Sequence, residues 1–252
     1  MNHPLFTIIT VTWNARDVIG PTLRSVWEQT FADFEHLVMD GASTDGTTDA
    51  VLSHPGCDER LTLVSEPDKG LYDAMNKAID LASGRYLIFL NAGDAFASAD
   101  TLQRLADAAQ GDPGVIYGQT QLVDADRRVV GMRHLTAPEH LDANSFKRGM
   151  LVCHQAFVAR HDLVPHYNLS YRYSADYDWC IRVLKASPAN AYVGPKPVIS
   201  FLTDGLTDKH HRASLMERYR IMCRHYGTLP TVVRHISFIP RFVVTEVKKR
   251  LR

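Results

Sequence analysis

The first hundred residues alternate short runs of apolar and β-branched residues with stretches of helical periodicity. We expect strands over Phe6–Thr12, Phe34–Asp40, Leu61–Ser65 and Arg85–Asn91. Between them, apolar residues recur every three or four positions and predict helices over Arg16–Gln29, from about Thr47, and over Leu71–Ala82. This alternation indicates an α/β fold, with a doubly wound, mostly parallel sheet and helices on both faces.

The second half of the chain is less regular. Val115–Val123 and Val129–Arg133 are expected to pair as antiparallel strands, Tyr173–Leu184 to form a helix, and a basic helix to run from Lys209 to about Tyr226. The sequence contains no internal repeat and no linker rich in Gly, Ser or Pro. We therefore expect one domain over residues 1–208 and a basic C-terminal helical extension over 209–252.

The net charge of zero conceals a division along the chain. Residues 1–208 carry 17 basic and 26 acidic side chains, whereas residues 209–252 carry 11 basic and 2 acidic ones, so the two parts have net charges of −9 and +9. The first residues do not resemble a signal peptide, no apolar stretch reaches the ~18–20 residues that span a bilayer, and the four cysteines are widely spaced. These features favour a cytoplasmic protein.

Residues 231–252 combine apolar side chains at helical spacing with basic side chains between them. Two interpretations remain open. The segment binds the anionic inner face of the cell membrane as a peripheral anchor, or it docks on the domain with its basic face in water. Nucleic-acid binding is disfavoured, because the rest of the chain is acidic and contains no recognition motif.

Polar residues follow all four predicted strands of the first half. They are Thr12-Trp13-Asn14, the turn that begins Asp40-Gly41, Glu66-Pro67-Asp68-Lys69-Gly70, and Asn91-Ala92-Gly93-Asp94. In open α/β sheets, ligands bind outside the carboxyl ends of the strands. An acidic cleft holds a phosphate only with a divalent cation in between, and Asp94 is the best placed carboxylate for Mg²⁺ or Mn²⁺. The alternative is that Asp94 is a turn or cap residue.

These strand ends, with "VMDGASTDGT" and "EPDKGLYDAMNKAIDLASGRYLIFLNAGD" between them, resemble family 2 glycosyltransferases of the GT-A fold. The branch that is most similar adds sugars during bacterial surface polysaccharide or glycolipid synthesis. The resemblance covers about residues 5–95 densely and continues through His154-Gln155 and Ala175-Asp176-Tyr177-Asp178-Trp179 to about residue 220. It implies an inverting enzyme that moves a sugar from a nucleotide-diphosphate sugar to a hydroxyl of a glycan or lipid-linked acceptor.

The resemblance also implies roles for the residues that bind the donor. Trp13 would stack on the nucleotide base with Thr12 and Asn14 beside it, Asp40 would lie at the floor of the pocket, and Asp68 would contact the nucleoside. Lys69 would contact a phosphate, Asn91 the ribose or sugar, and His154 and Gln155 would line the donor-sugar or acceptor pocket. Core packing for Trp13, solvation for Lys69 and a hydrogen-bonded core position for His154 are the alternatives.

The metal motif D-x-D of the family is reduced here to Asn91-Ala92-Gly93-Asp94, so Asp94 would hold the cation and pyrophosphate. His211, in the pair His210-His211, would close over the diphosphate or join the metal, unless both histidines belong to a solvated helix. Two further positions depart from the family pattern. Gly41 stands where many members have an Asp that recognises uracil, and Met75 stands where many have an Arg near the pyrophosphate.

An inverting transfer requires one general base that removes the proton of the acceptor hydroxyl. The family places it in an x-D motif at the start of a helix, and Asp176 matches that position. Asp178 lies two residues further, roughly 200° around a helix, and is expected to serve the helix dipole instead.

Two other functions remain as alternatives. A sugar nucleotidyltransferase would have a Gly-rich, Arg-containing loop after the first strand, which Thr12-Trp13-Asn14-Ala15 is not. A nucleotide-sugar-binding protein that has lost catalysis would fit the reduced D-x-D and the missing Arg.

Overall fold

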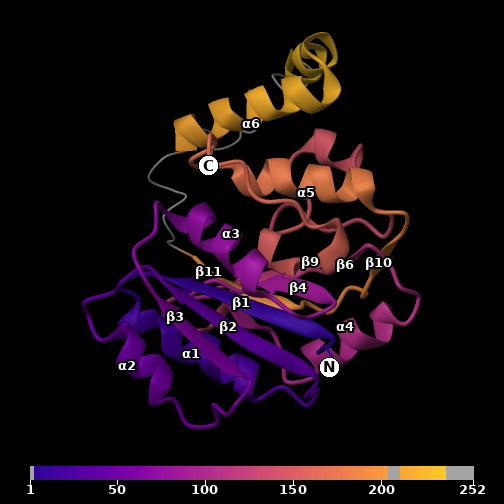
Figure 1. Ribbon diagram of the computed structural model, residues 1–252. Coiled ribbons are helices and arrows are strands. Elements are labelled where there is room, and N and C mark those ends of the chain that lie inside the picture. The colour runs from indigo at the N-terminus through magenta and orange to yellow at the C-terminus, as the bar shows by residue number, and fades with distance from the viewer. Residues whose placement is uncertain (1–2, 204–210, 237–252) are drawn as a thin grey trace, which may run out of the picture.

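The computed structural model describes residues 3–203 and 211–236, which form an α/β fold around a large sheet (Figure 1). The strands are β1 (Phe6–Thr12), β2 (Phe34–Asp40), β3 (Leu61–Ser65), β4 (Tyr86–Phe89), β5 (Ala95–Phe96), β6 (Val115–Tyr117), β7 (Thr120–Val123), β8 (Val129–Met132), β9 (Phe157–Arg160), β10 (Asn190–Tyr192) and β11 (Ile199–Leu202). The α-helices are α1 (Arg16–Trp27), α2 (Thr47–Leu52), α3 (Leu71–Leu81), α4 (Thr101–Ala109), α5 (Ala175–Ala186) and α6 (His211–Tyr226). Residues 228–236 are also helical.

The main sheet has seven strands in the order β10-β6-β9-β4-β1-β2-β3. β1 pairs in parallel with β2 and β4, so that Phe6 lies opposite both Phe34 and Tyr86. β2 pairs in parallel with β3, and β10 with β6, whereas β9 runs antiparallel between β4 and β6. The prediction of a mostly parallel sheet is confirmed.

The two central strands are buried throughout. Every side chain of β1 and of β4 is buried, as expected for strands that helices cover on both faces. Figure 1 shows α1 and α2 against one face of the sheet and α3 and α5 over the other. This burial explains why both strands read as nearly continuous apolar or β-branched runs in the sequence.

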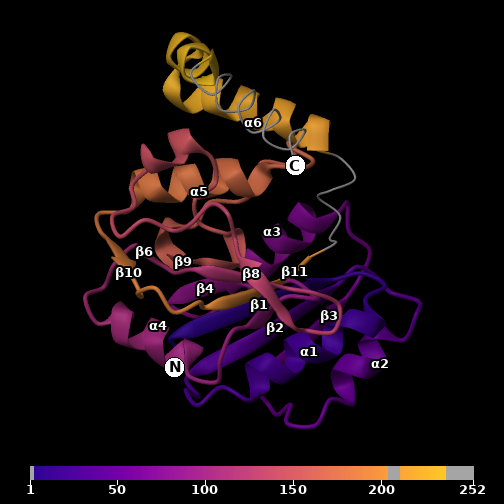
Figure 2. The ribbon, with the colours of Figure 1, turned by 180° about the vertical axis from the view of Figure 1, so that it is seen from behind.

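A second sheet has four strands in the order β5-β11-β7-β8. In the view from behind, β8 and β11 lie in front of the main sheet (Figure 2). The prediction of one long strand over Val115–Val123 was wrong, because this run divides between the two sheets. Tyr117 pairs with β9 and β10, whereas Thr120 begins β7, which pairs with β11 and with the antiparallel β8.

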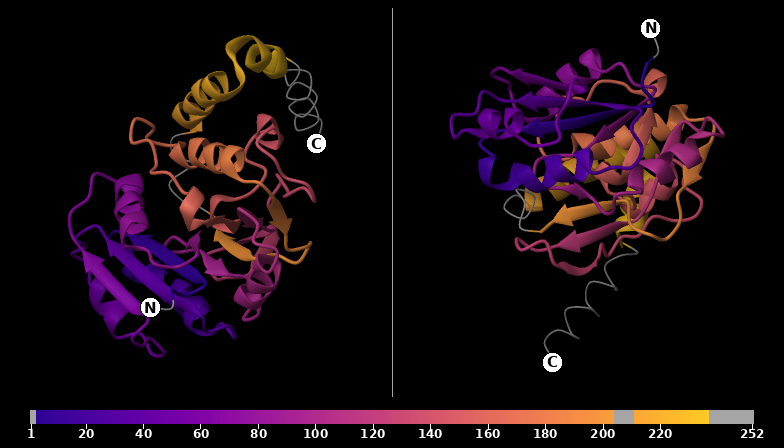
Figure 3. Two further views of the ribbon diagram at one scale, coloured as in Figure 1. Left: turned by 45° about the vertical axis from the view of Figure 1, so that its right-hand side comes forward. Right: turned by 90° about the horizontal axis from the view of Figure 1, so that it is seen from below.

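Helix α6 is the outermost element and is separated from the main sheet by α5 (Figure 3). Asp178 and Arg182 of α5 form an ion pair, and Asp178 also accepts a hydrogen bond from His225 of α6. Within residues 3–203 and 211–236, no helix is long and apolar enough to cross a membrane.

Candidate active site

The strand ends that the sequence singled out meet at one edge of the main sheet. In the parallel pairing, Thr12 lies opposite Asp40, and Asp40 lies opposite Ser65. The turn that contains Asn91 and Asp94 follows β4, on the other side of β1. The loops that follow these four strands therefore surround a common area.

The loop after β1 is fastened to the loop after β2. The backbone N–H of Asn14 donates to Ser43 Oγ at 2.7 Å, and Asn14 Oδ1 accepts the N–H of Thr44 at 3.0 Å. Asn14 has a positive φ of 46°, a conformation that Asn tolerates better than most residues. Its amide thus holds the loop, while Thr12 beside it is buried and its Oγ1 contacts no hydrogen-bond partner in the described residues.

Asp40 lies beneath these loops and is 2% exposed. One of its oxygens accepts the N–H of Ser43 at 2.9 Å and the hydroxyl of Ser65 at 2.7 Å, and the other accepts the hydroxyl of Ser43 at 2.5 Å. The carboxylate therefore ties the turn after β2 to the end of β3. Asp40 therefore lies below the loops that follow β1, β2 and β3, and its hydrogen bonds hold the loop after β2 and the end of β3 in place.

Trp13, Gly41 and Asp68 converge above Asp40. The indole of Trp13 is 69% exposed, so core packing is not its role. A Cβ atom on Gly41 would lie 2.6 Å from Asp68 Oδ2 and 3.3 Å from Trp13 Cδ1, so a side chain at this position would displace Asp68 or Trp13. The backbone N–H of Gly70 donates a hydrogen bond to Asp68 Oδ1 at 2.7 Å and orients this carboxylate. The result is an open aromatic face beside a carboxylate. The neighbouring Lys69 is exposed.

Asp94 is 5% exposed and lies in the turn after β4. Gln155 Nε2 donates to its Oδ2 at 2.7 Å, and the N–H of Leu202 donates to its Oδ1 at 3.1 Å. Gly93 has a φ of +100°, which L-residues rarely adopt, and so allows the chain to turn here. Burial raises the pKa of Asp94 to about 7, although both hydrogen bonds act in the opposite direction.

Arg127, from the loop between β7 and β8, approaches the same turn. Its Nη1 donates to the carbonyl of Gly93 at 2.5 Å, and its charge lowers the pKa of Asp94. Arg127 could not be identified from the sequence, because it lies 33 residues beyond Asp94 in a polar turn without a motif. Only the second sheet brings it to this edge.

The oxygens around Asp94 fit a divalent cation. Asn91 Oδ1 is buried and accepts no hydrogen bond from the described residues, and each oxygen of Asp94 accepts one hydrogen bond and retains a second lone pair. Mg²⁺ and Mn²⁺ prefer oxygen ligands, and Mg²⁺ commonly uses one or two carboxylates together with substrate phosphates. Within residues 3–203 and 211–236, no three His, Cys, Asp or Glu side chains form a metal cluster by themselves.

His154 lies in an aromatic cluster next to Gln155. It is 5% exposed, stacks on Phe89 with ring centroids 5.1 Å apart, and shares a 2.6 Å hydrogen bond between its Nε2 and the hydroxyl of Tyr167. Burial lowers the pKa of His154 to about 4, so the ring is neutral near pH 7. Its place is that of a hydrogen-bonded core residue, which positions Tyr167.

Asp176 lies in the first turn of α5 and is partly exposed. Its Oδ1 accepts the N–H of Tyr177 at 2.8 Å and the hydroxyl of Tyr72 at 3.2 Å. Its Oδ2 accepts no hydrogen bond from the described residues. Tyr72 in turn stacks on Tyr167 at 5.4 Å, and the Asp176 carboxylate raises the pKa of His154, against the effect of burial. The aromatic cluster thus links Asp176 to the residues around Asp94.

Asp178 has different surroundings. It is 2% exposed, Arg182 donates to its Oδ2 at 2.8 Å, and His225 shares a 2.7 Å hydrogen bond with its Oδ1. Arg182 lies on α5 itself, and the His225 contact holds α6 against α5. The side chain of His211 and the residues 204–210 and 237–252 lie outside the described part of the structure.

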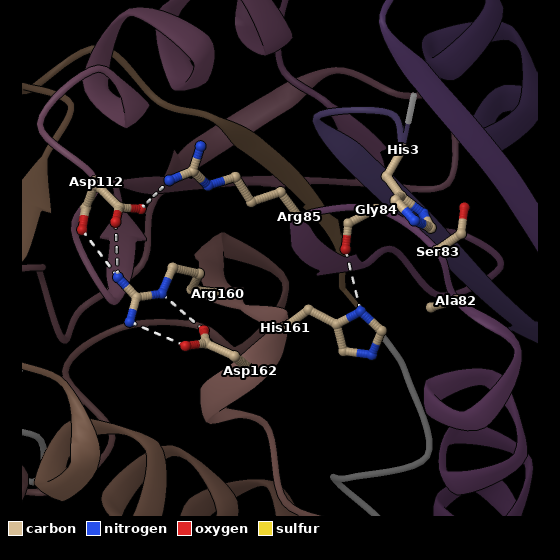
Figure 4. Close-up of a pocket in the computed structure, with 9 residues that line it drawn as sticks. All are labelled: His3, Ala82, Ser83, Gly84, Arg85, Asp112, Arg160, His161 and Asp162. Atoms are coloured by element: carbon tan, nitrogen blue, oxygen red, sulfur yellow. Dashed lines mark hydrogen bonds and ion pairs between the residues drawn. The ribbon is translucent and has the colours of Figure 1, made fainter. Parts of the chain in front are cut away.

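A pocket of about 920 Å³ opens at the other edge of the main sheet, at the amino ends of its parallel strands (Figure 4). Its charged side chains neutralise one another: Asp112 pairs with Arg85 at 2.7 Å and with Arg160 at 3.1 Å, and Arg160 also pairs with Asp162 at 2.7 Å. The residues that the sequence analysis selected lie at the opposite edge. The pocket therefore does not coincide with them.

A family model described as Glycosyl transferase family 2 matches residues 7–166. A PGL/p-HBAD biosynthesis glycosyltransferase of Mycobacterium bovis is 40% identical over 188 residues, which are 72% of this chain and 70% of the relative.

Two solved structures share the fold. TarS of S. aureus in complex with UDP-GlcNAc has a TM-score of 0.66 at 15% identity, over 92% of this chain and 73% of the other. The mannosyltransferase PcManGT of Pyrobaculum calidifontis in complex with GDP-Man and Mn²⁺ has a TM-score of 0.61 at 17% identity, over 99% of this chain and 81% of the other. At these identities the likeness establishes the architecture.

Proposed function

We propose a function for this chain from its membership of glycosyl transferase family 2 and its GT-A fold, which make it a glycosyltransferase. It transfers a sugar from a nucleotide-diphosphate sugar to a hydroxyl group of a glycan or lipid-linked acceptor. The transfer inverts the configuration at the anomeric carbon. The observation that carries the proposal is the pair of carboxylates at the carboxyl edge of the sheet. Asp94 is buried, and Asn91 of the same turn has an amide oxygen with no hydrogen-bond partner among the described residues. Asp176 is partly exposed, and its Oδ2 accepts no hydrogen bond from that part of the chain.

The donor nucleotide would lie over the loops after β1, β2 and β3. Trp13 would stack on the base, which is worth ~1–3 kcal/mol by analogy with single-stranded nucleic acids. Asp68, in the space that Gly41 leaves, would accept hydrogen bonds from the base or ribose, and Lys69 would contact a phosphate. Thr12 and Asn14 would shape this pocket from below, and Asp40 would hold its loops together.

The diphosphate would lie over the turn from Asn91 to Asp94. Asp94 and Asn91 would hold Mn²⁺ or Mg²⁺ there, with His211 as a further candidate ligand. The cation would neutralise the charge of the departing nucleoside diphosphate. Gln155 fixes the orientation of Asp94 by its hydrogen bond to Oδ2, and Arg127 adds positive charge to the same turn. His154 would shape the sugar pocket indirectly, because its hydrogen bond orients the Tyr167 side chain.

Asp176 would act as the general base. Its Oδ2 would accept the proton of the acceptor hydroxyl while that oxygen forms a bond to the anomeric carbon and the bond to the diphosphate breaks. Attack from the face opposite the leaving group inverts the configuration. The hydrogen bonds from Tyr72 and Tyr177 to Oδ1 keep the other oxygen available for this step.

If the acceptor is lipid-linked, α6 and the helical segment 228–236 would hold the enzyme at the inner face of the cell membrane, where the acceptor lies. Leu229, Val233 and Ile236 are 75%, 60% and 59% exposed on the helical segment 228–236, and residues 231–252 contain six Lys or Arg and one Glu. An amphipathic basic segment binds anionic headgroups. Sedimentation with anionic vesicles that weakens on removal of residues 231–252 supports this placement; unchanged sedimentation contradicts it.

The transfer reaction is tested with a panel of donors. Thermal shifts with UDP-, GDP- and dTDP-sugars, with and without Mn²⁺, identify which nucleotide the donor site binds. Nucleoside-diphosphate release in the presence of octyl glycosides then measures turnover, and NMR of the product gives its anomeric configuration. Donor binding without turnover on any acceptor would favour the binding protein that has lost catalysis, and retention of configuration would contradict the single-base mechanism.

A further inference from the structure

Helix α6 carries a single acid in a basic stretch. Between residues 211 and 236 the sequence has five arginines and one carboxylate, Glu217. This carboxylate forms no ion pair among the described residues. Its Oε1 accepts the backbone N–H of Arg172 at 2.9 Å, and its Oε2 accepts the backbone N–H of Tyr173 at 2.8 Å. Both oxygens of Glu217 thus hold two consecutive peptide groups in front of α5.

The next residue along the chain is also held by α6. Ser174 flanks the start of α5, where a serine usually caps its own helix, yet it makes no such hydrogen bond. Its hydroxyl instead lies 3.0 Å from Ser214 Oγ. The N–H of Tyr177 donates to the carbonyl of Ser174 at 3.1 Å and to Asp176 Oδ1 at 2.8 Å. Helix α6 therefore fixes the three consecutive residues Arg172, Tyr173 and Ser174, which end two positions before Asp176.

We propose that Glu217 is a positioning residue for the general base: it fixes the backbone at Arg172 and Tyr173 and thereby sets where the Asp176 carboxylate points. This inference rests on the proposed role of Asp176. Glu217 is placed on α6, and nothing in the described structure places it against the donor loops. Its effect reaches the acceptor through the start of α5.

Hydrogen bonds with an ionised acceptor are roughly twice as strong as neutral ones, and two of them on neighbouring N–H groups define an orientation as well as a position. Without Glu217, the backbone N–H groups of Arg172 and Tyr173 lose these two hydrogen bonds, and the segment before α5 is held less rigidly. A misplacement of about 1 Å at a reacting group costs on the order of 100-fold in rate.

The rest of α6 has its own attachment to α5. His225 bonds to Asp178 at 2.7 Å and lies 3.1 Å from Lys185 Nζ. Tyr226 donates to the carbonyl of Ala143 at 2.5 Å. Substitution of Glu217 therefore leaves α6 docked and affects the segment before Asp176, together with the charge that acts on Tyr72. Substitution of His225 loosens the docking at Asp178, which lies on the opposite side of α5 from Asp176.

The experiment compares Glu217→Gln and Glu217→Ala with His225→Ala as a matched control for loss of stability. Turnover is nucleoside-diphosphate release from the preferred donor with an octyl glycoside, and donor Kd is measured separately. Since Gln keeps one acceptor oxygen and Ala keeps none, we expect kcat to fall about 10-fold in Glu217→Gln and about 100-fold in Glu217→Ala, with donor Kd and donor KM within about 2-fold. His225→Ala lowers the Tm at least as much and keeps kcat within about 3-fold.

Asp176→Asn, assayed in parallel, separates the two hypotheses. If this variant retains nearly normal transfer, the base assignment falls, whatever Glu217 does. If transfer collapses in Asp176→Asn while Glu217→Ala keeps the wild-type kcat, the positioning role is overturned and the base assignment stands. A fall in kcat that follows Tm equally in the Glu217 and His225 variants also overturns it, since that pattern reflects stability alone.

Discussion

Tyr72 donates its hydroxyl hydrogen to Oδ1 of Asp176 across 3.2 Å, and so connects α3 of the first half of the chain to α5 of the second. Burial and the adjacent carboxylate raise the pKa of Tyr72 well above its usual value, so the phenol remains a donor at neutral pH. The two residues are 104 positions apart in sequence. The proposed base is therefore oriented by the half of the molecule that would bind the donor.

Replacement of Tyr72 by Phe removes this hydrogen bond and retains the stacking on Tyr167. A hydrogen bond to a charged group is worth about 1.5–3 kcal/mol, so we expect kcat to fall about 10-fold or more while donor affinity is unchanged. Turnover assays measure this. Tyr86→Phe is the matched control, because it loses a buried hydroxyl bonded to Pro113 near the other edge of the sheet. An equal loss of kcat in both variants would contradict the role of Tyr72.

Gly41→Ala tests the nucleotide pocket. The added methyl group would lie 2.6 Å from Asp68 Oδ2 and 3.3 Å from Trp13 Cδ1, so one of the two side chains must move. We expect nucleoside-diphosphate affinity to weaken at least about 10-fold, the loss of roughly one hydrogen bond or stacking contact. Gly20→Ala is the control, since a Cβ there meets no atom within 4 Å. Isothermal titration with the preferred nucleoside diphosphate gives both values, and equal affinities would place the nucleotide elsewhere.

Asp94→Asn tests the cation site. The substitution keeps the shape of the side chain and removes the charge that would bind Mn²⁺, so nucleoside-diphosphate affinity should lose its dependence on Mn²⁺. Asp100→Asn is the control, because that carboxylate pairs with Lys196 on the surface. Titrations with and without Mn²⁺ give the result. If Asp94→Asn retains the wild-type Mn²⁺ dependence, the cation is bound by other residues.

Much of the first half of the fold could be predicted from the sequence. β1, β2 and β3 have the predicted bounds, because their apolar and β-branched runs end sharply at polar turns. The convergence of the strand ends followed from parallel pairing alone. In the second sheet, the antiparallel pairing of β7 with β8 was predicted. The pairings of β11 with β5 and with β7 could not be predicted, because these strands are two to four residues long and distant in sequence.

The contacts of the site residues were less predictable than their positions. Asp178 was expected to serve the helix dipole, and the structure shows it bound to Arg182 and to His225, 47 residues away. Arg127 and Glu217 carried no local signal, since each lies in an ordinary polar segment and acquires its role through tertiary packing. Periodicity reports which face of an element is buried, and it does not report what that face meets.

The pH dependence of stability should reflect His36. This residue of β2 is fully buried, lies 3.0 Å from Thr10 Oγ1, and has a pKa lowered to about 3, mainly by burial and also by His54. The unfolded chain binds a proton here below about pH 6.5, and the folded chain does not, so stability is full above that pH and falls as the pH decreases toward 3. We expect His36 to contribute a loss of about 2 kcal/mol at pH 5.

Urea unfolding at pH 7.5 and pH 5.0 measures this contribution in the wild type and in His36→Gln. The variant cannot be protonated at that position, so its stability should change less between the two pH values. The buried His154, with a pKa lowered to about 4, contributes equally to both proteins and cancels in the comparison. An identical pH dependence would show that His36 does not titrate in this way.

The most direct test of the proposed mechanism is the rate of sugar transfer by Asp176→Asn, measured with saturating donor and compared with the donor Kd of the same variant. Loss of a general base costs about 10²–10⁴-fold, so transfer should fall by that factor while the donor Kd remains within about 2-fold of the wild type. Transfer at a nearly normal rate would contradict the role of Asp176 as the base.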